Sequence, residues 1–234
     1  MPHFTDPLHL GPVQKRGPVP LDPTRMDKGV GPLGQIYVYD IVPDAPDADG
    51  VIAEQAITAA GGPATGINGA LATGGVATFD VPRGVVAAWT GTAVMTVTGT
   101  DVYGRVQVES SASGTSMAGK KAFKTITSVS VSADVTAATV GTGDVLGLPF
   151  RVTDGGYLVR VGWAGAVADN AGTFVAADAT SPATATTGDP RGTFDPSSAA
   201  DGSRRLVIAM ALTGIQVGPD ATDAGVYGVT PFAG

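Results

Sequence analysis

The sequence predicts an all-β protein, with a β-sandwich or jelly-roll-like body that follows an extended, proline-rich N-terminal arm. Gly, Ala, Thr and Val make up 125 of its 234 residues, whereas glutamate, which favours helices, occurs only twice. The 34 glycines and 17 prolines divide the chain into short β-rich runs that end in turn residues. This pattern excludes a helical bundle, and the hydrophobic content of 43% is sufficient for a buried core.

The arm spans residues 1–34, of which seven are proline. Each proline removes a backbone donor and biases the residue before it to extended geometry, so neither a helix nor a central strand is expected. Such a segment makes few internal contacts, and we expect it to be ordered by contact with other subunits or with the body. Residues 35–234 form that body, which could divide into two packed β subdomains near residue 115.

The first elements of the body are expected to be strands. Residues 35–42 (QIYVYDIV) are rich in β-formers, and residues 51–60 fit either a strand or a short helix. Residues 76–81 (VATFDV) alternate in polarity, and we expect this strand to end at Pro82. A second short apolar run follows at residues 85–90.

Two β-hairpins are predicted from turn residues. Residues 93–98 and 105–110 flank a Gly- and Asp-containing turn. Residues 149–153 and 157–163 flank the Asp-Gly-Gly sequence at 154–156. We expect this second turn to join adjacent antiparallel strands, with glycine supplying positive φ angles.

The remaining elements follow the same reasoning. Residues 123–135 alternate, with Thr and Ser on one face, and residues 204–213 (RRLVIAMALT) form an apolar run that suits a strand buried on both faces. A last short strand is expected at residues 226–232, and the stretch 178–203 is read as turns.

One short motif is similar to the serine block of the subtilisin-like proteases: Gly114–Ala118, with the sequence GTSMA. That chemistry needs a histidine base oriented by an aspartate. The two histidines, His3 and His9, both lie in the arm. We therefore interpret Ser116 as part of a connection between strands rather than as a nucleophile.

A second motif, Gly141–Gly147, has the form of a phosphate-binding loop. Its G-x-G-x-x-x-G spacing is one residue too long for the dinucleotide fingerprint, and Pro149 opposes the helix that should follow. We expect a turn that connects strands.

Asp44, Asp47 and Asp49 precede Gly50, as in a calcium-binding loop. The spacing of that loop is not met, because Glu54 follows too early. We expect a solvated turn. No His/Cys/carboxylate group suits zinc, and the absence of cysteine excludes disulfides and thiol catalysis.

Tryptophan and phenylalanine side chains are spread along the expected strands, and we interpret them as core residues rather than as a sugar-stacking platform. The residues concerned are Trp89, Trp163, Phe79, Phe123, Phe150, Phe174 and Phe194. We therefore expect no catalytic residue, no cofactor-binding residue and no metal site.

Charge and hydropathy exclude several classes of partner. The arm has a net charge of +1 and residues 35–234 a net charge of −8, so the body repels phosphate backbones and no direct nucleic-acid contact is expected. The sequence has no apolar run of 18 residues, so we expect no membrane span. The first residues lack the basic and apolar regions of a signal peptide, so we expect none.

Several segments of the sequence resemble segments of virion structural proteins of tailed bacteriophages. They are residues 76–88 (VATFDVPRGVVAA), 94–111 (VMTVTGTDVYGRVQVESS), 119–126 (GKKAFKTI), 140–152 (VGTGDVLGLPFRV), 172–187 (GTFVAADATSPATATT) and 191–205 (RGTFDPSSAADGSRR). The resemblance implies a capsid decoration (cement) protein that is made in the host cytoplasm and stabilises the head shell by non-covalent contacts. It also implies two partners, the major capsid protein and copies of the chain itself, with a trimer as the suggested homo-oligomer.

Two other interpretations stay open. The first is another virion component: a tail, adaptor or fibre protein, or the major capsid subunit. The common phage shell fold has a long helix, and no pattern for one is visible in this sequence. The second is a β-sandwich module that binds a carbohydrate or receptor, which would need a cluster of exposed aromatic side chains.

Overall fold

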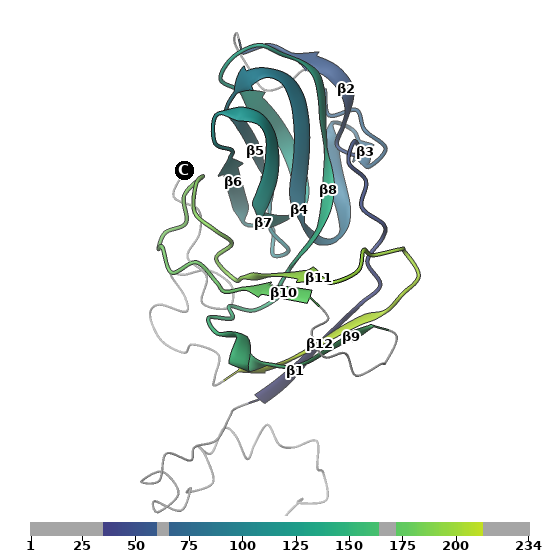
Figure 1. The fold of residues 1–234 in the computed structure, drawn as a ribbon, viewed down its shortest axis with the longest axis vertical. Coiled ribbons are helices and arrows are strands. Elements are labelled where there is room, and N and C mark those ends of the chain that lie inside the picture. Colours follow the sequence, from purple (N-terminus) through teal and green to yellow (C-terminus); the bar gives the residue numbers. More distant parts are fainter. Residues whose placement is uncertain (1–34, 60–65, 164–171, 213–234) are drawn as a thin grey trace, which may run out of the picture.

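A computed structural model describes residues 35–59, 66–163 and 172–212, and it confirms the all-β prediction (Figure 1). In chain order the elements are β1 (Gln35–Ile41), β2 (Ile52–Ile57), β3 (Ala72–Thr73), β4 (Val76–Ala93), β5 (Met95–Thr100), β6 (Val106–Ser110), β7 (Gly114–Val131), β8 (Val135–Gly147), the 3-10 turn η1 (Gly155–Tyr157), β9 (Leu158–Trp163), β10 (Gly172–Val175), β11 (Thr193–Pro196) and β12 (Leu206–Leu212).

The strands of these residues form two antiparallel sheets. The larger has nine strands in the order β10-β11-β8-β4-β7-β5-β6, with β2 paired to β8 and β3 to β4, and the smaller has the order β1-β12-β9. The predicted arm and the strand expected at 226–232 lie outside the described residues.

The large sheet curls into a half-barrel around the first of two apolar cores. Figure 1 shows the long strands β4, β7 and β8 bending together around β5 and β6. The side chains of these strands that point into the core are fully or almost fully buried, among them Phe79, Met95, Phe123, Ile126 and Val129. Burial of each such side chain contributes about 1.5–3 kcal/mol to folding.

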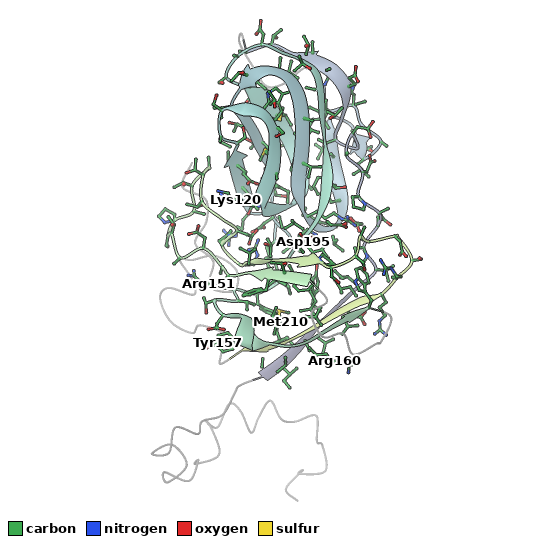
Figure 2. All side chains as sticks on the ribbon, viewed as in Figure 1. Lys120, Arg151, Tyr157, Arg160, Asp195 and Met210 are labelled. Carbon is green, nitrogen blue, oxygen red and sulfur yellow. The ribbon has the colours of Figure 1, made fainter. Side chains whose placement is uncertain are left out.

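The small sheet covers a second core at the other end of the body. Leu206, Ile208 and Met210 lie on one face of β12 and are fully buried. Met210 points between the small sheet and the β10–β11 pair (Figure 2). Val207 and Ala209, on the opposite face, are only partly buried, so burial on both faces of this strand is not complete.

The strand expected to end at Pro82 does not end there. β4 continues from Val76 to Ala93, and its register against β7 shifts between Thr78 and Arg83. An irregularity of this kind bends a strand and leaves a position unpaired, so a residue without an N–H group is tolerated. The two short runs predicted on either side of Pro82 are therefore one bent strand.

The hairpin predicted around residues 154–156 is wrong. The carboxylate of Asp154 accepts a hydrogen bond from the N–H of Gly156 at 2.7 Å and caps η1, and neither Gly155 nor Gly156 has a positive φ angle. β9 then pairs with β12 instead of with residues 149–153. The Asp154 cap and the pairing of β9 with the apolar strand β12 are therefore more favourable together than a tight turn with residues 149–153 would be.

Other predictions are confirmed or corrected by the pairing of the strands. The hairpin of residues 93–110 is confirmed as β5 paired with β6, and the ambiguous segment 51–60 contains the strand β2. The stretch 178–203, read as turns, contains β11. Residue 115, near which the body could divide into two subdomains, is the second residue of β7.

Candidate functional site

Charged side chains are buried where the half-barrel meets the segment between β10 and β11, residues 176–192. This junction cluster has five members, each at most 4% exposed: Asp101, Glu109, Lys121, Asp189 and Arg191. The first three come from the β5–β6 turn, β6 and β7, and the last two from segment 176–192. Ionised groups are rarely buried unless they are paired or hydrogen-bonded, so the partners of each one define what the cluster does.

Glu109 joins two strands that are not neighbours in the sheet. Its Oε1 and Oε2 atoms accept hydrogen bonds from the N–H groups of Lys120 (2.5 Å) and Lys121 (3.1 Å). The side chain of Gln107, also on β6, donates to the carbonyl of Ala122 at 2.9 Å. Burial raises the pKa of Glu109, and the two N–H donors and the charge of Lys121 only partly offset this. Side chains of β6 thus take the place of a strand partner for residues 120–122 of β7.

Lys121 is fully buried and connects β6 to the segment 176–192. Its Nζ donates to the carbonyl of Val108 at 2.9 Å and to the carbonyl of Thr184. Burial lowers the pKa of Lys121, and the nearby carboxylates of Glu109, Asp189 and Asp178 act against this. The ammonium group therefore fastens the segment to the barrel.

Asp189 also binds the segment 176–192 to β7. Its Oδ2 accepts from the N–H of Ala122 at 2.9 Å, and its Oδ1 accepts from the N–H groups of Arg191 (2.8 Å) and Gly192 (3.1 Å). Burial raises the pKa of Asp189, while the charge of Arg191 and the three N–H donors act to lower it. One carboxylate thus organises the segment's own turn and binds it to β7.

Arg191 and Asp101 form a buried ion pair between the segment and the β5–β6 turn. Nη2 of Arg191 lies 2.8 Å from Oδ2 of Asp101, and the guanidinium carbon lies 5.4 Å from the ring centroid of Tyr103. The other oxygen of Asp101 accepts from the N–H groups of Tyr103 and Arg105. The hydroxyl of Tyr103 donates to the carbonyl of Pro149 at 2.8 Å, which links the same turn to the chain after β8.

A third buried cation, Arg83, lies outside the junction cluster and holds the connection between β1 and β2. It is 1% exposed, binds Asp80 at 2.8 and 2.9 Å, and donates to the carbonyls of Gly143 and Asp44. Burial acts to raise the pKa of Asp80, but hydrogen bonds from Arg83 and from the N–H groups of Asp44 and Val81 lower it overall.

All these charged groups bind main-chain groups or one another, so the role that their contacts support is a structural one. Bonds to fixed backbone groups hold the two parts of the body in one arrangement. Among the described residues, no group of three or more His, Cys, Asp or Glu side chains is placed to hold a metal ion.

The structure places Ser116 near the start of a strand. It is exposed on β7, opposite Ala88 of β4, so the protease-like motif begins a strand instead of the helix that the serine opens in those enzymes. It is also not the connection between strands that we expected. His3 and His9 lie outside the described residues.

The glycine-rich motif is likewise part of a strand. Gly141 and Gly147 belong to β8, and the predicted connecting turn is wrong. A Cβ atom at Gly141 would lie 1.9 Å from the carbonyl oxygen of Asp47, and one at Gly147 would lie 2.4 Å from Cβ of Ala122. Close packing of the chain against β8, and not a phosphate, accounts for these two glycines.

Asp47 and its neighbours form the expected turn. The N–H of Asp47 donates to the hydroxyl of Thr142 at 2.9 Å, and its carbonyl accepts from the N–H of Thr142 at 2.7 Å. Asp44 has a different partner, since its N–H donates to Asp80. The turn is therefore anchored on β8 and β4 through main-chain groups.

The core interpretation of the aromatic residues is confirmed. All seven lie in the two apolar cores or pack against them: Phe79, Trp89 and Phe123 in the first, and Phe150, Trp163, Phe174 and Phe194 in the second.

Sequence reasoning missed the junction cluster. Gln107 and Glu109 alternate with Val106 and Val108, a pattern that normally turns the valines inward. In the structure Val106 is 58% exposed while Gln107 and Glu109 are buried. The rarity of glutamate was the one signal available, since Glu109 is one of only two in the chain.

Within the described ranges, no helix is long and apolar enough to cross a bilayer. Comparison of the chain with family models, with curated proteins and with solved structures finds no match in any of the three.

Proposed function

We propose that the protein is a structural component of a tailed-phage virion, and specifically a capsid decoration protein that binds the head shell by non-covalent contacts. The observation that carries this proposal is the junction cluster. Its buried charges hold a curled β-body in one arrangement, which suits a protein that must keep a surface shape on a particle under load. The sequence segments that resemble phage virion proteins are the reason for placing it on a phage head.

The acidic character of the body supports the same role. A net charge of −7 keeps the chain away from packaged nucleic acid and favours contacts with protein. The arm carries a net charge of only +1, so we expect shell binding to depend on apolar burial and strand pairing more than on charge.

The test uses phage particles that lack the chain because its gene has been disrupted. Purified full-length chain is added back, and unbound protein is removed by sedimentation. We expect saturable binding that survives high salt, and a higher temperature of DNA release from the heads. Complete release by salt alone would contradict the apolar contact, and failure to bind heads would contradict the decoration role.

A further inference from the structure

The peptide bond between Asp189 and Pro190 is enclosed within the junction cluster. Asp189 is 4% exposed, and Pro190 and Arg191 are buried as well. An aspartyl–prolyl bond is unusually labile in acid, because the aspartyl carboxyl group can attack its own carbonyl carbon and the leaving nitrogen is that of a tertiary amide without an N–H group. The geometry around this bond favours such an attack.

The carboxylate of Asp189 lies alongside the carbonyl group that it would attack. The N–H of Gly192 donates to both groups, at 3.1 Å to Oδ1 and at 3.3 Å to the main-chain carbonyl oxygen of Asp189. Since one N–H group reaches both oxygens, they lie on the same side of the residue. The N–H of Arg191 also bonds Oδ1, at 2.8 Å, which folds the side chain toward the bond between Asp189 and Pro190.

Two main-chain N–H groups polarise the same carbonyl. Besides Gly192, the N–H of Asp178 donates to the carbonyl oxygen of Asp189 at 2.9 Å. Two donors on one carbonyl oxygen stabilise the negative charge that develops when the carbonyl carbon is attacked, and they act most strongly where water is excluded. The segment 176–192 thus supplies an oxyanion hole for an attack by the side chain of Asp189.

The charged groups around Asp189 favour its neutral form. They are Lys121 on β7, Glu109 on β6, Asp178 and Arg191 in its own segment, and Asp101, which pairs with Arg191. Among these groups two cations are set against four carboxylates, Asp189 included, and an excess of carboxylates favours the uptake of a proton. Burial also raises the pKa of Asp189, and the charge of Arg191 and three N–H donors only partly offset this. The neutral acid therefore forms in milder acid than in an ordinary aspartate.

We propose that the chain cleaves its own backbone between Asp189 and Pro190 in mild acid. An oxygen of the neutral carboxyl group bonds to the carbonyl carbon of the same residue, the bond from that carbon to the nitrogen of Pro190 breaks, and the carboxyl proton passes to that nitrogen. The products are a five-membered cyclic anhydride at Asp189 and the free amine of Pro190. Water then opens the anhydride to two carboxyl groups, so the net reaction is hydrolysis of one peptide bond.

The break leaves the last part of the chain in place while the fold persists. β11 and β12 both follow the bond, and they pair with β8 and β10 and with β1 and β9, respectively. We therefore expect the two fragments to separate only on denaturation. The inference concerns the isolated chain, so it stands or fails independently of the proposed place on a virion.

A second aspartyl–prolyl bond among the described residues provides an internal control. Asp195 and Pro196 belong to the strand β11, and Asp195 is exposed. Its carboxyl group therefore meets water instead of the enclosed, polarised setting of Asp189. Two more bonds of this kind, at residues 6–7 and 22–23, lie outside the described residues.

The first test incubates the purified full chain at pH values from about 7 down to about 4.5, just above the ordinary aspartate pKa, wherever circular dichroism shows it to be folded. Intact-mass spectrometry after denaturation reports the fragments. We expect fragments 1–189 and 190–234 to exceed fragments 1–195 and 196–234 at least about tenfold, because of the polarised carbonyl of the first bond. Concentrated urea should remove this preference, and the rate should not depend on the concentration of the chain.

The second test changes the leaving nitrogen. Pro190→Ala leaves the carboxyl group of Asp189 and its N–H donors in place but gives the bond an ordinary secondary amide, so cleavage at this position should fall to the level of other peptide bonds. Pro196→Ala makes the same change in β11 and is the matched control. It should leave cleavage after Asp189 unchanged.

Three results would overturn the inference. The first is a chain that stays intact at every pH at which it is folded. The second is equal cleavage after Asp189 and after Asp195 in the folded chain, which would mean that the junction does not promote the reaction. The third is unchanged cleavage in Pro190→Ala, which would assign the break to a contaminating protease.

Discussion

The carboxylate of Glu109 in β6 accepts a hydrogen bond from the N–H of Lys121 in β7 at 3.1 Å, although β5 lies between these strands in the sheet order. The bond is possible because the sheet curls until β6 faces the first half of β7. The ammonium group of the same Lys121 then returns to the carbonyl of Val108 in β6 at 2.9 Å. Two buried residues of opposite charge thus close the open side of the half-barrel, and Lys121 also binds the segment 176–192.

Glu109→Gln is expected to destabilise the protein. The carboxylate accepts two backbone N–H groups, and an amide can accept with only one of its two terminal atoms. One buried N–H group then loses its partner, at a cost of about 1–3 kcal/mol. Urea unfolding followed by tryptophan fluorescence gives the change.

The other glutamate is the control for that experiment. Glu54 is exposed on β2, and Glu54→Gln should change the free energy of unfolding by less than about 0.5 kcal/mol. Equal effects of the two substitutions would mean that the Glu109 bonds do not hold the barrel.

Lys121→Met should be more damaging than the same change at the neighbouring Lys120. Methionine fills a similar volume but leaves the carbonyls of Val108 and Thr184 without a donor and the buried carboxylates without their cation. Removal of one partner from a buried ionic group costs about 3–5 kcal/mol. Lys120→Met, one residue earlier and exposed, should be nearly neutral in the same unfolding assay, and a reversed order would contradict the assignment.

Gly141→Ala tests the close packing of the Asp47 turn on β8. The new methyl group would lie 1.9 Å from a carbonyl oxygen, so the backbone must move, at a cost of about 1–3 kcal/mol. Gly114→Ala adds a methyl group where no atom lies within 4 Å, and should change stability by less than about 1 kcal/mol. Thermal unfolding by circular dichroism distinguishes the two.

The Asp201 turn predicts a stability change in acid. N–H groups of Arg204 and Ser203, which bond to the carboxylate, lower the pKa of Asp201 from 3.8 to about 2. A lowered folded-state pKa means that the ionised form stabilises the fold. This contribution is complete above the ordinary value of 3.8 and is lost as the pH falls to about 2.

Asp201→Asn removes that dependence. The difference in melting temperature between the original chain and the variant should shrink between pH 5 and pH 2. A difference that stays constant over this range would show that the carboxylate does not titrate with folding.

The sequence predicted the elements whose neighbours along the chain determine them. Residues 95–110 formed the expected hairpin because the turn and both strands are local. The pairing of β9 with β12 was not predicted, since the partner lies more than forty residues away and the local Asp154 cap resembles a hairpin turn.

The junction cluster could not be predicted for a related reason. Whether Glu109 or Val106 points inward depends on which backbone groups the curled sheet leaves unpaired, and no local pattern contains that information. The aromatic residues were predicted correctly because burial of a large apolar side chain is favourable in almost any β fold.

The proposed role as a capsid decoration protein is tested most directly by cryo-electron microscopy of purified, intact virions. The proposal predicts density for the curled β-body on the outer surface of the head, in a fixed ratio to the major capsid protein. Heads without that density, from particles in which mass spectrometry also fails to detect the chain, would contradict it.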